Sequence, residues 1–416
     1  MAVRIGHATI GELMTATRNP LHVLIAGAGV AALEAALALQ ALARDDVSVE
    51  LAAPEAEFTY RPLAVTEPFR VDEVRRFPLQ QLAESAGARL RTGSVAAVDP
   101  ERKVVTLENG QELTYDILLL ALGARPREAV TGALTFRGPQ DGPALSALLD
   151  KTTAGEIRRI AFAVPTGATW PLPLYELALL TAEYMAAHGT RGVEILLVTP
   201  EDHPLSLFGP AASEAVSELL AIRGIQLKTS VAPVRFEAGA LRIVAERPIA
   251  VDAVVALPQL EGPRLPGVPH DERGFVPTDE YGRVLGLTDV YAAGDLTQFP
   301  LKQGGTATQQ ADAAASSIAA DAGATVKPKP FRPVLRGLLL TGLAPRFLRA
   351  DATGAHSVID TEPLWWPPAK IVGRYLTPFL AAKLGLAETV VGPLQEGAIP
   401  IEVELETSGR PAWSRI

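Results

Sequence analysis

The stretch from His22 to Leu39 constrains the fold more than any other part of the chain. An apolar run breaks at Gly27-Ala28-Gly29 and continues as a run rich in alanine and leucine. This order is typical of a strand, a tight glycine turn and a helix. Gly27 would permit the turn, Gly29 would let a pyrophosphate approach the backbone, and Ala32 would keep the helix close to the strand. An ordinary strand-helix turn gives the same pattern, so later stretches must decide between the two.

Composition excludes several classes of function. A chain of 416 residues predicts two or three domains. Its net charge of -9 argues against a nucleic-acid partner, because binding phosphates requires a basic face. The chain has no cysteine, which excludes disulfides, thiolate metal sites and any relay of electrons through a thiol. The six histidines show no ligand spacing, so we expect no metal site.

The chain shows no targeting signal. Residues 1–20 are charged and lack the apolar centre of a signal peptide, so we expect a short extension there. No apolar run reaches the roughly 18 residues that a spanning helix needs. We therefore expect a cytoplasmic protein, with attachment to the inner face of a membrane left open.

A second parallel strand is predicted at Val47–Ala53. In a dinucleotide-binding fold, an acid at the end of this strand usually holds a ribose hydroxyl. Glu55 is the preferred candidate, with Glu50 and a solvated loop as alternatives.

The next segment, residues 56–70, is predicted to be a loop. Tyr60, Arg61 and Pro62 could form a wall over the ligand, or the segment could be a plain surface loop. Residues 71–86 favour a helix, and residues 90–116 favour a small antiparallel layer. The aliphatic run ending at Ala121 and Gly123 predicts a central strand whose end lies close to a bound ring.

A second pass of the same architecture begins near Ile157, with strand, helix and strand in order. Where a second glycine fingerprint should stand, the chain has prolines and Trp170. Because proline donates no N–H and Trp170 fills space, we expect this unit to keep the fold without the usual dinucleotide grip. Gly167 and Glu201 leave nicotinamide binding as an alternative.

The chain is predicted to return to the first unit through a proline-rich linker, residues 258–277. A short strand then ends at Gly294-Asp295, and a turn at Gly304-Gly305 opens a long alanine-rich helix. This helix would aim a second N-terminus at the pocket.

Four motifs together resemble the two-dinucleotide-binding-domain flavoproteins. They are Gly27-x-Gly29-x-x-Ala32, the Leu-Ala-Leu-Gly ending at Gly123, Val290-Tyr-Ala-Ala-Gly-Asp295 and Lys302-Gln-Gly-Gly. Phe58-x-Tyr-Arg-Pro-Leu63 and the altered second fingerprint are most similar to sulfide:quinone oxidoreductases and type II NADH dehydrogenases.

The resemblance implies FAD in the first domain. It implies pyrophosphate on Gly27, Ala28 and Gly29, ribose near Glu55, and adenine near Val95. The ribityl chain would lie by Asp295, and Gly294 would end its strand. Arg61, Ala121, Gly123, Gly304, Gly305 and Lys302 would complete the cofactor site, with the helix N–H groups near the flavin's pyrimidine edge. A helix cap for Asp295 and a solvated loop position for Lys302 remain alternatives. Tyr60, Trp170 and Lys302 are candidates for lining the reactive face.

The chain also departs from these families. Sulfide-oxidising relatives carry sulfur on cysteines, which are absent here, and type II NADH dehydrogenases keep the second glycine fingerprint. We therefore predict an FAD-dependent oxidoreductase that passes electrons from an unidentified small donor to a small acceptor such as a quinone. The alternatives are an NAD(P)H:quinone reductase and an FAD-binding protein without turnover.

The predicted architecture is α/β, with two Rossmann-like three-layer β/β/α domains and a C-terminal α+β region. The first domain would comprise 21–126 and 270–327, the second 127–269, and the C-terminal region 328–416. Within 363–384, an amphipathic helix with Trp365, Trp366 and Tyr375 suits either the membrane surface or a core or dimer contact.

Overall fold

The computed structural model describes residues 19–351 and 357–384. Its first sheet is parallel, with strands in the order β20-β9-β1-β2-β5. The strands are β1 (Leu21–Ala26), β2 (Val47–Ala53), β5 (Ala88–Thr92), β9 (Ile117–Leu120) and β20 (Val290–Ala292). β20 comes from a distant part of the sequence, so the chain returns to this first sheet after the second unit.

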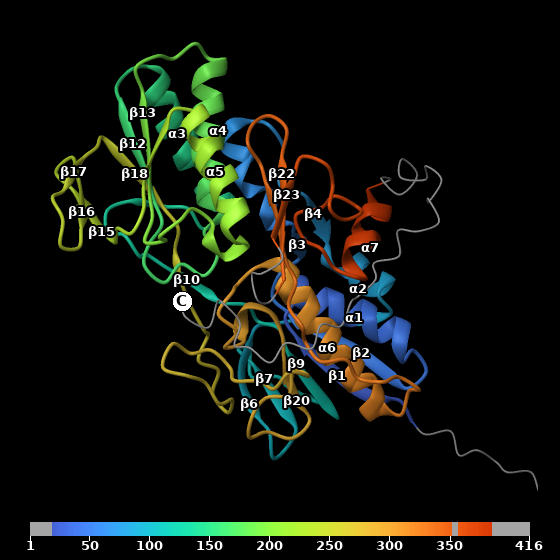
Figure 1. Cartoon of the computed structure of the whole chain (residues 1–416). Coiled ribbons are helices and arrows are strands. Elements are labelled where there is room, and N and C mark those ends of the chain that lie inside the picture. Colours follow the sequence, from blue (N-terminus) through green and yellow to red (C-terminus); the bar gives the residue numbers. More distant parts are fainter. Residues whose placement is uncertain (1–18, 352–356, 385–416) are drawn as a thin grey trace, which may run out of the picture.

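The two faces of this sheet carry different layers. Helices α1 (Val30–Leu42), α2 (Leu79–Ser85) and α6 (Gly304–Ala322) cover one face, where alanines let α1 and α6 pack side by side (Figure 1). An antiparallel sheet of β6 (Val95–Asp99), β7 (Val104–Leu107) and β8 (Glu112–Thr114) covers the other. Successive residues of a strand face opposite sides of the sheet. Because a layer covers each side, the apolar side chains on both faces of these strands are buried.

The second unit repeats this three-layer arrangement. Its parallel sheet has the order β11-β18-β12-β13-β14, with β11 (Leu134–Thr135), β12 (Arg159–Ala163), β13 (Glu194–Val198), β14 (Ile225–Lys228) and β18 (Ala253–Ala256). One face carries α3 (Gly142–Thr153), α4 (Leu172–Ala187) and α5 (Pro210–Ile222). The other carries β15 (Pro233–Glu237), β16 (Ala240–Ile243) and β17 (Ile249–Ala250). The predicted fold class, two Rossmann-like β/β/α units, is confirmed.

Two connections join the units. Strands β10 (Arg125–Arg127) and β19 (Gln259–Glu261) pair antiparallel where the chain passes between the sheets. The predicted wall segment forms β3 (Glu57–Thr59) and two 3-10 helices, η1 (Arg61–Val65) and η2 (Glu67–Phe69). Apolar side chains of these helices join the core of the second unit, so the segment is a packed bridge.

The predicted helix over residues 71–86 is wrong in its first half. Strand β4 (Arg76–Pro78) pairs with β3 and only α2 is helical. Phe58 and Phe77 stand opposite each other in this pair and turn their rings inward, with centroids 6.3 Å apart. Cross-strand aromatic packing therefore replaces the expected helix there.

The C-terminal region lies against both units (Figure 1). Strands β21 (Leu335–Leu339), β22 (Arg346–Ala350) and β23 (Ser357–Asp360) form an antiparallel sheet beside α4 and α5. The predicted helix within 363–384 is shorter than expected, because α7 spans only Leu376–Lys383. Pro378 is its third residue, a position where a missing N–H costs no helical bond.

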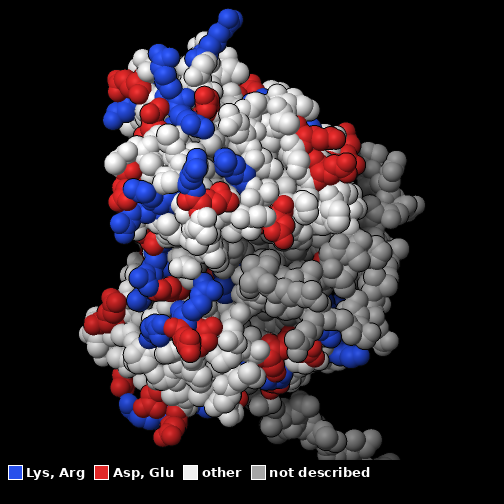
Figure 2. Space-filling view, turned by 60° about the vertical axis from the view of Figure 1, so that its left-hand side comes forward, with Lys and Arg blue, Asp and Glu red and all other residues white. Residues whose placement is uncertain are grey.

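The surface carries both signs of charge. Figure 2 shows Lys and Arg side chains next to Asp and Glu side chains along one side of the face, beside a broad uncharged area. Within the described ranges, no helix is long and apolar enough to cross a membrane.

Candidate functional site

The glycine turn after β1 combines two glycines with different roles. Gly27 has φ 120°, and its N–H donates to the carbonyl of Ala52 at 2.8 Å. A Cβ on Gly27 would lie 2.3 Å from the carbonyl oxygen of Ala121, so a larger residue cannot fit there. Gly29, in contrast, is extended at φ -78°, and a Cβ there would meet no atom within 4 Å. Gly27 therefore serves backbone packing, whereas Gly29 faces open space.

The N-terminus of α1 follows this turn without a side-chain cap. Gly29 is the N-cap residue and offers no side-chain hydrogen bond, and the first turn holds no acidic residue. Ala28 and Ala32 are buried, and Ala32 packs the helix against the sheet as predicted. The first N–H groups of the helix and its positive dipole end therefore have no side-chain cap and no acidic residue in the first turn, as expected at an anion site.

The neighbouring strands end at the same edge of the sheet. β9 continues into Ala121 and Gly123, and Gly123 has φ 70° with open space where a Cβ would be. β20 continues into Gly294 and Asp295 on a 3-10 helix, η5 (Gly294–Leu296). Because carboxyl ends of parallel strands meet at one edge, the three motifs converge there.

Asp295 and Lys302 form the charged part of this edge. Burial raises the pKa of the Asp295 carboxyl, while Lys302 and Arg61 oppose that shift. Lys302 is only 6% exposed, donates from Nζ to the carbonyl of Thr297, and lies 3.9 Å from the centre of the Phe275 ring. Burial lowers its pKa to about 8, with Asp295 acting in the opposite direction. The alternative of a solvated loop lysine is therefore wrong.

The N-terminus of α6 differs from the prediction. Gln303 caps it, and its Oε1 accepts the N–H of Gly305 at 2.8 Å. Ile371 covers Gly304, since a Cβ there would lie 2.7 Å from Ile371 Cγ1. The expected free N–H of Gly305 is therefore already bound. The buried Nε2 of Gln303 has no partner among the described residues and is the donor that faces this end instead.

The two candidate ribose acids lie in different surroundings. Glu50 is in the middle of β2, and its carboxylate lies 3.0 Å from Arg91 Nη2 and 3.3 Å from His22 Nε2. Glu55 lies two residues beyond the end of β2 and is exposed. These contacts link Glu50 on β2 to the neighbouring strands β1 and β5. Glu55 therefore remains the candidate for the ribose acid. Val95, the predicted adenine neighbour, begins β6.

Tyr60 and Arg61 lie on the bridge between the units. The Tyr60 hydroxyl oxygen accepts the N–H of Ile371 at 3.0 Å, and burial raises the pKa of this phenol to about 12. This hydrogen bond ties Tyr60 to the C-terminal region.

Arg61 lines a cleft of about 340 Å³ together with Thr59, Arg76, Pro139 and Gln140.

Trp170 lies in the second unit, just before α4. Its ring packs edge-on against Phe208, with centroids 5.7 Å apart, at the margin of the second core. Glu201 accepts hydrogen bonds from Tyr175 Oη at 2.7 Å and Thr199 Oγ1 at 2.9 Å. Gly167 adopts φ 78° beside Gln259. Core packing thus holds the Trp170 ring, and its predicted role in lining the reactive face stays a prediction.

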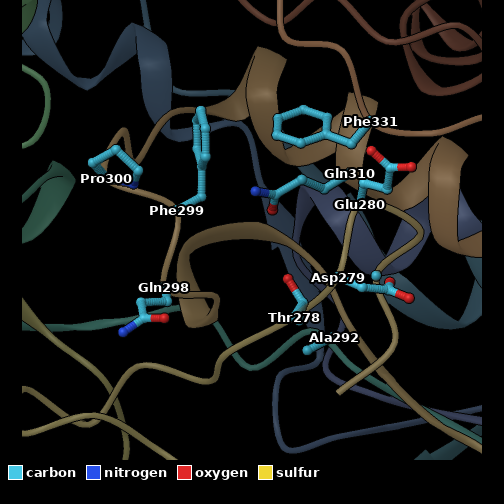
Figure 3. Close-up of a pocket in the computed structure, with 10 residues that line it drawn as sticks. Thr278, Asp279, Glu280, Ala292, Gln298, Phe299, Pro300, Gln310 and Phe331 are labelled. Atoms are coloured by element: carbon cyan, nitrogen blue, oxygen red, sulfur yellow. The ribbon is translucent and has the colours of Figure 1, made fainter. Parts of the chain in front are cut away.

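A second cavity, also about 340 Å³, opens at the outer edge of the first sheet beside β20 (Figure 3). The rings of Phe299 and Phe331 meet edge-on above it, with centroids 5.0 Å apart. Gln310 reaches into it, and its Oε1 accepts the N–H of Gly294 at 2.7 Å. The cavity thus lies behind the turn that carries Asp295. Residues 19–351 and 357–384 contain no cluster of side chains suited to a metal ion.

Comparisons with known proteins agree with this geometry. Residues 21–154 and 177–315 match the family described as Pyridine nucleotide-disulphide oxidoreductase. An NADH dehydrogenase-like protein from Mycobacterium tuberculosis is 26% identical over 307 residues, 66% of this chain and 72% of that protein. Mouse Apoptosis-inducing factor 3 is 28% identical over 231 residues, which cover 51% of this chain but only 34% of that protein.

Solved structures show the same fold at low identity. The sulfide:quinone oxidoreductase of Aquifex aeolicus superposes with a TM-score of 0.79 and 18% identity, covering 94% of this chain and 99% of that one. A ferredoxin reductase from Rhodopseudomonas palustris gives 0.60 and 18%, covering 80% and 82%. NDH2 from Plasmodium falciparum gives 0.55 and 16%, covering 67% and 64%. The predicted resemblance to sulfide:quinone oxidoreductases and type II NADH dehydrogenases is confirmed.

Proposed function

Because the chain belongs to the pyridine nucleotide-disulphide oxidoreductase family and is an oxidoreductase, we propose that it binds FAD in the first unit and passes electrons through the flavin. The observation that carries this proposal is the open, uncapped turn at Gly29. A pyrophosphate would supply the counter-charge that this helix end lacks.

The other residues at this edge fit the rest of FAD. Glu55 would hold the adenosine ribose and Asp295 the ribityl chain. Gln303 Nε2, buried without a partner among the described residues, would donate to the ring's pyrimidine edge. Lys302 would place positive charge near a reduced anionic ring and so favour reduction. Bound flavin supplies the redox chemistry, so no cysteine relay is needed.

We propose a small donor and a small acceptor, with a quinone as the preferred acceptor. Two features of the second unit argue against NAD(P)H as the donor. Glu201, where a second ribose acid would stand, is already bound by Tyr175 and Thr199. Leu172 at the start of α4 packs on Gly337 of β21, so the C-terminal region covers that helix end.

An NAD(P)H:quinone reductase remains the second candidate, because a relative is named NADH dehydrogenase-like. Anaerobic titration of the purified holoprotein with NADH, NADPH and a soluble quinol distinguishes the two. We expect the quinol, but neither nicotinamide, to exchange electrons with the flavin at a useful rate. Rapid bleaching of the flavin by NADH or NADPH would favour the second candidate. Inertness toward every donor and quinone would favour a binding protein without turnover.

We further propose that this protein is cytoplasmic and that it makes peripheral membrane contact through its residues 363–384. Trp366 is 57% exposed and could reach a membrane surface. Trp365 instead donates from Nε1 to the carbonyl of Ala369 and packs on Phe347. Trp366→Ala alone therefore tests membrane contact without removing the structural contacts of Trp365. It should lose co-sedimentation with liposomes, whereas unchanged co-sedimentation, or none in the wild type, would leave a core or dimer role.

A further inference from the structure

The segment formed by residues 370–376, here called the strap, is held by side chains from four separate elements. Lys370 binds Glu176 of α4, and the N–H of Ile371 donates to Tyr60. The hydroxyl of Thr308 on α6 donates to the carbonyl of residue 372 at 2.7 Å. At the other end, the N–H groups of residues 375 and 376 donate to the Glu34 carboxylate of α1 at 2.9 and 2.7 Å. The strap therefore ties the two units and both cofactor-facing helices together.

A buried ion pair fixes the strap to the second unit. Lys370 Nζ lies 2.6 Å from both carboxylate oxygens of Glu176, and the side chains are 7% and 0% exposed. Glu176 also accepts the N–H of Leu340. Since removing one member of such a pair leaves a buried charge without a partner, this contact strongly determines where the strap lies.

Ile371 brings the strap onto the cofactor edge. Its side chain is 3% exposed and lies directly on Gly304, the first residue of α6. The unpartnered Nε2 of Gln303 lies in the residue just before Gly304. Tyr60, which holds the Ile371 N–H, comes from the wall segment of the first unit. The strap thus puts a branched apolar side chain where the flavin ring is proposed to end.

We propose that Ile371 is a specificity-determining residue that limits which acceptors reach the flavin, and that the Lys370–Glu176 pair is the positioning contact that holds it there. This inference rests on the proposed FAD function. It selects an uncharged, apolar acceptor, because the covering side chain offers an apolar surface and no hydrogen bond. In quinone reduction, the reduced flavin gives up two electrons and its proton, and the quinone takes one further proton from solvent to become the quinol.

The test uses FAD-loaded protein reduced with dithionite, so that no natural donor is needed. Reoxidation by a small benzoquinone is compared with reoxidation by a bulkier naphthoquinone, and iodide quenching of the oxidised flavin's fluorescence reports its access to solvent. The variants are Ile371→Ala and Lys370→Met/Glu176→Gln, the double change removing both charges together. Lys383→Met is the matched control, because Lys383 lies on α7 and its Nζ reaches Ser85 on the exposed surface.

We expect Ile371→Ala to keep its FAD and to favour the bulkier quinone by about tenfold relative to wild type, the scale that a few carbon atoms in a pocket provide. The double variant should show several-fold stronger iodide quenching, and Lys383→Met should match wild type in both readouts. Holoproteins whose quinone preference and quenching are unchanged by either variant would overturn this inference while leaving the FAD proposal intact. Wild-type protein that binds no FAD would instead refute the proposed function.

Discussion

Substitution of Gly29 by valine should strongly weaken FAD binding without unfolding the protein. The backbone there is extended and a Cβ would meet nothing within 4 Å, so valine fits the apoprotein. Losing the glycine N-cap costs about 1 kcal/mol of stability. The valine methyl groups would occupy the space through which the pyrophosphate approaches the helix. Losing two N–H bonds to a charged group costs about 3–6 kcal/mol, which weakens binding by roughly 10²–10⁴-fold.

Two other glycines provide the controls. Gly110→Ala changes a turn glycine at φ 81° with open space around it, so it should lose about 1–2 kcal/mol of stability and keep wild-type FAD affinity. Gly27→Ala should fail to fold, because its Cβ would collide with Ala121. Apoprotein prepared from each variant is melted, then titrated with FAD by fluorescence. A Gly29→Val protein that folds and binds FAD as tightly as wild type would refute the reasoning.

Three further changes test the charged groups. Lys302→Met should lower the flavin midpoint potential by about 20–40 mV, because it removes positive charge near the reduced ring. A dye-equilibrium titration measures this potential, and an unchanged value would mean that Lys302 lies away from the flavin. Glu50→Gln should lower the free energy of unfolding by about 1 kcal/mol, because the ion pair with Arg91 is lost. The FAD affinity should stay unchanged. A loss of FAD affinity would instead mean that Glu50 holds the ribose. Burial raises the pKa of the Glu34 carboxyl, so the folded chain holds this proton to higher pH than the unfolded chain does, and stability falls as pH rises above the ordinary glutamate range. As pH rises above about 4.3, where an unfolded glutamate titrates, the melting temperature should fall less steeply for Glu34→Gln than for wild type, and parallel curves would contradict this.

The sheets and their covering helices could be predicted because their signals are local. Apolar runs, glycine turns and alanine-rich stretches repeat within about 20 residues, and hydrophobic periodicity detects such patterns. The motifs at Gly27, Gly123 and Gly294 converged for the same reason, since parallel strands end at one edge.

The parts that were mispredicted depend on distant contacts. Tyr60 meets Ile371 across 311 positions, and Glu34 meets Leu376 across 342. No periodicity encodes such pairs, so the sequence pattern of the strap resembles part of an amphipathic helix. The packing of Trp170 on Phe208 is likewise a contact between separate elements, which no local pattern shows. Gln303 carried a detectable signal, a polar residue directly before two glycines and a long helix, which could have identified it as the cap.

FAD content tests the central claim most directly. Purified protein is scanned for the flavin absorbance bands, then denatured, and the released cofactor is identified and counted against the chain. We predict about one FAD per chain, released on denaturation. A colourless protein that takes up no FAD on reconstitution would contradict it.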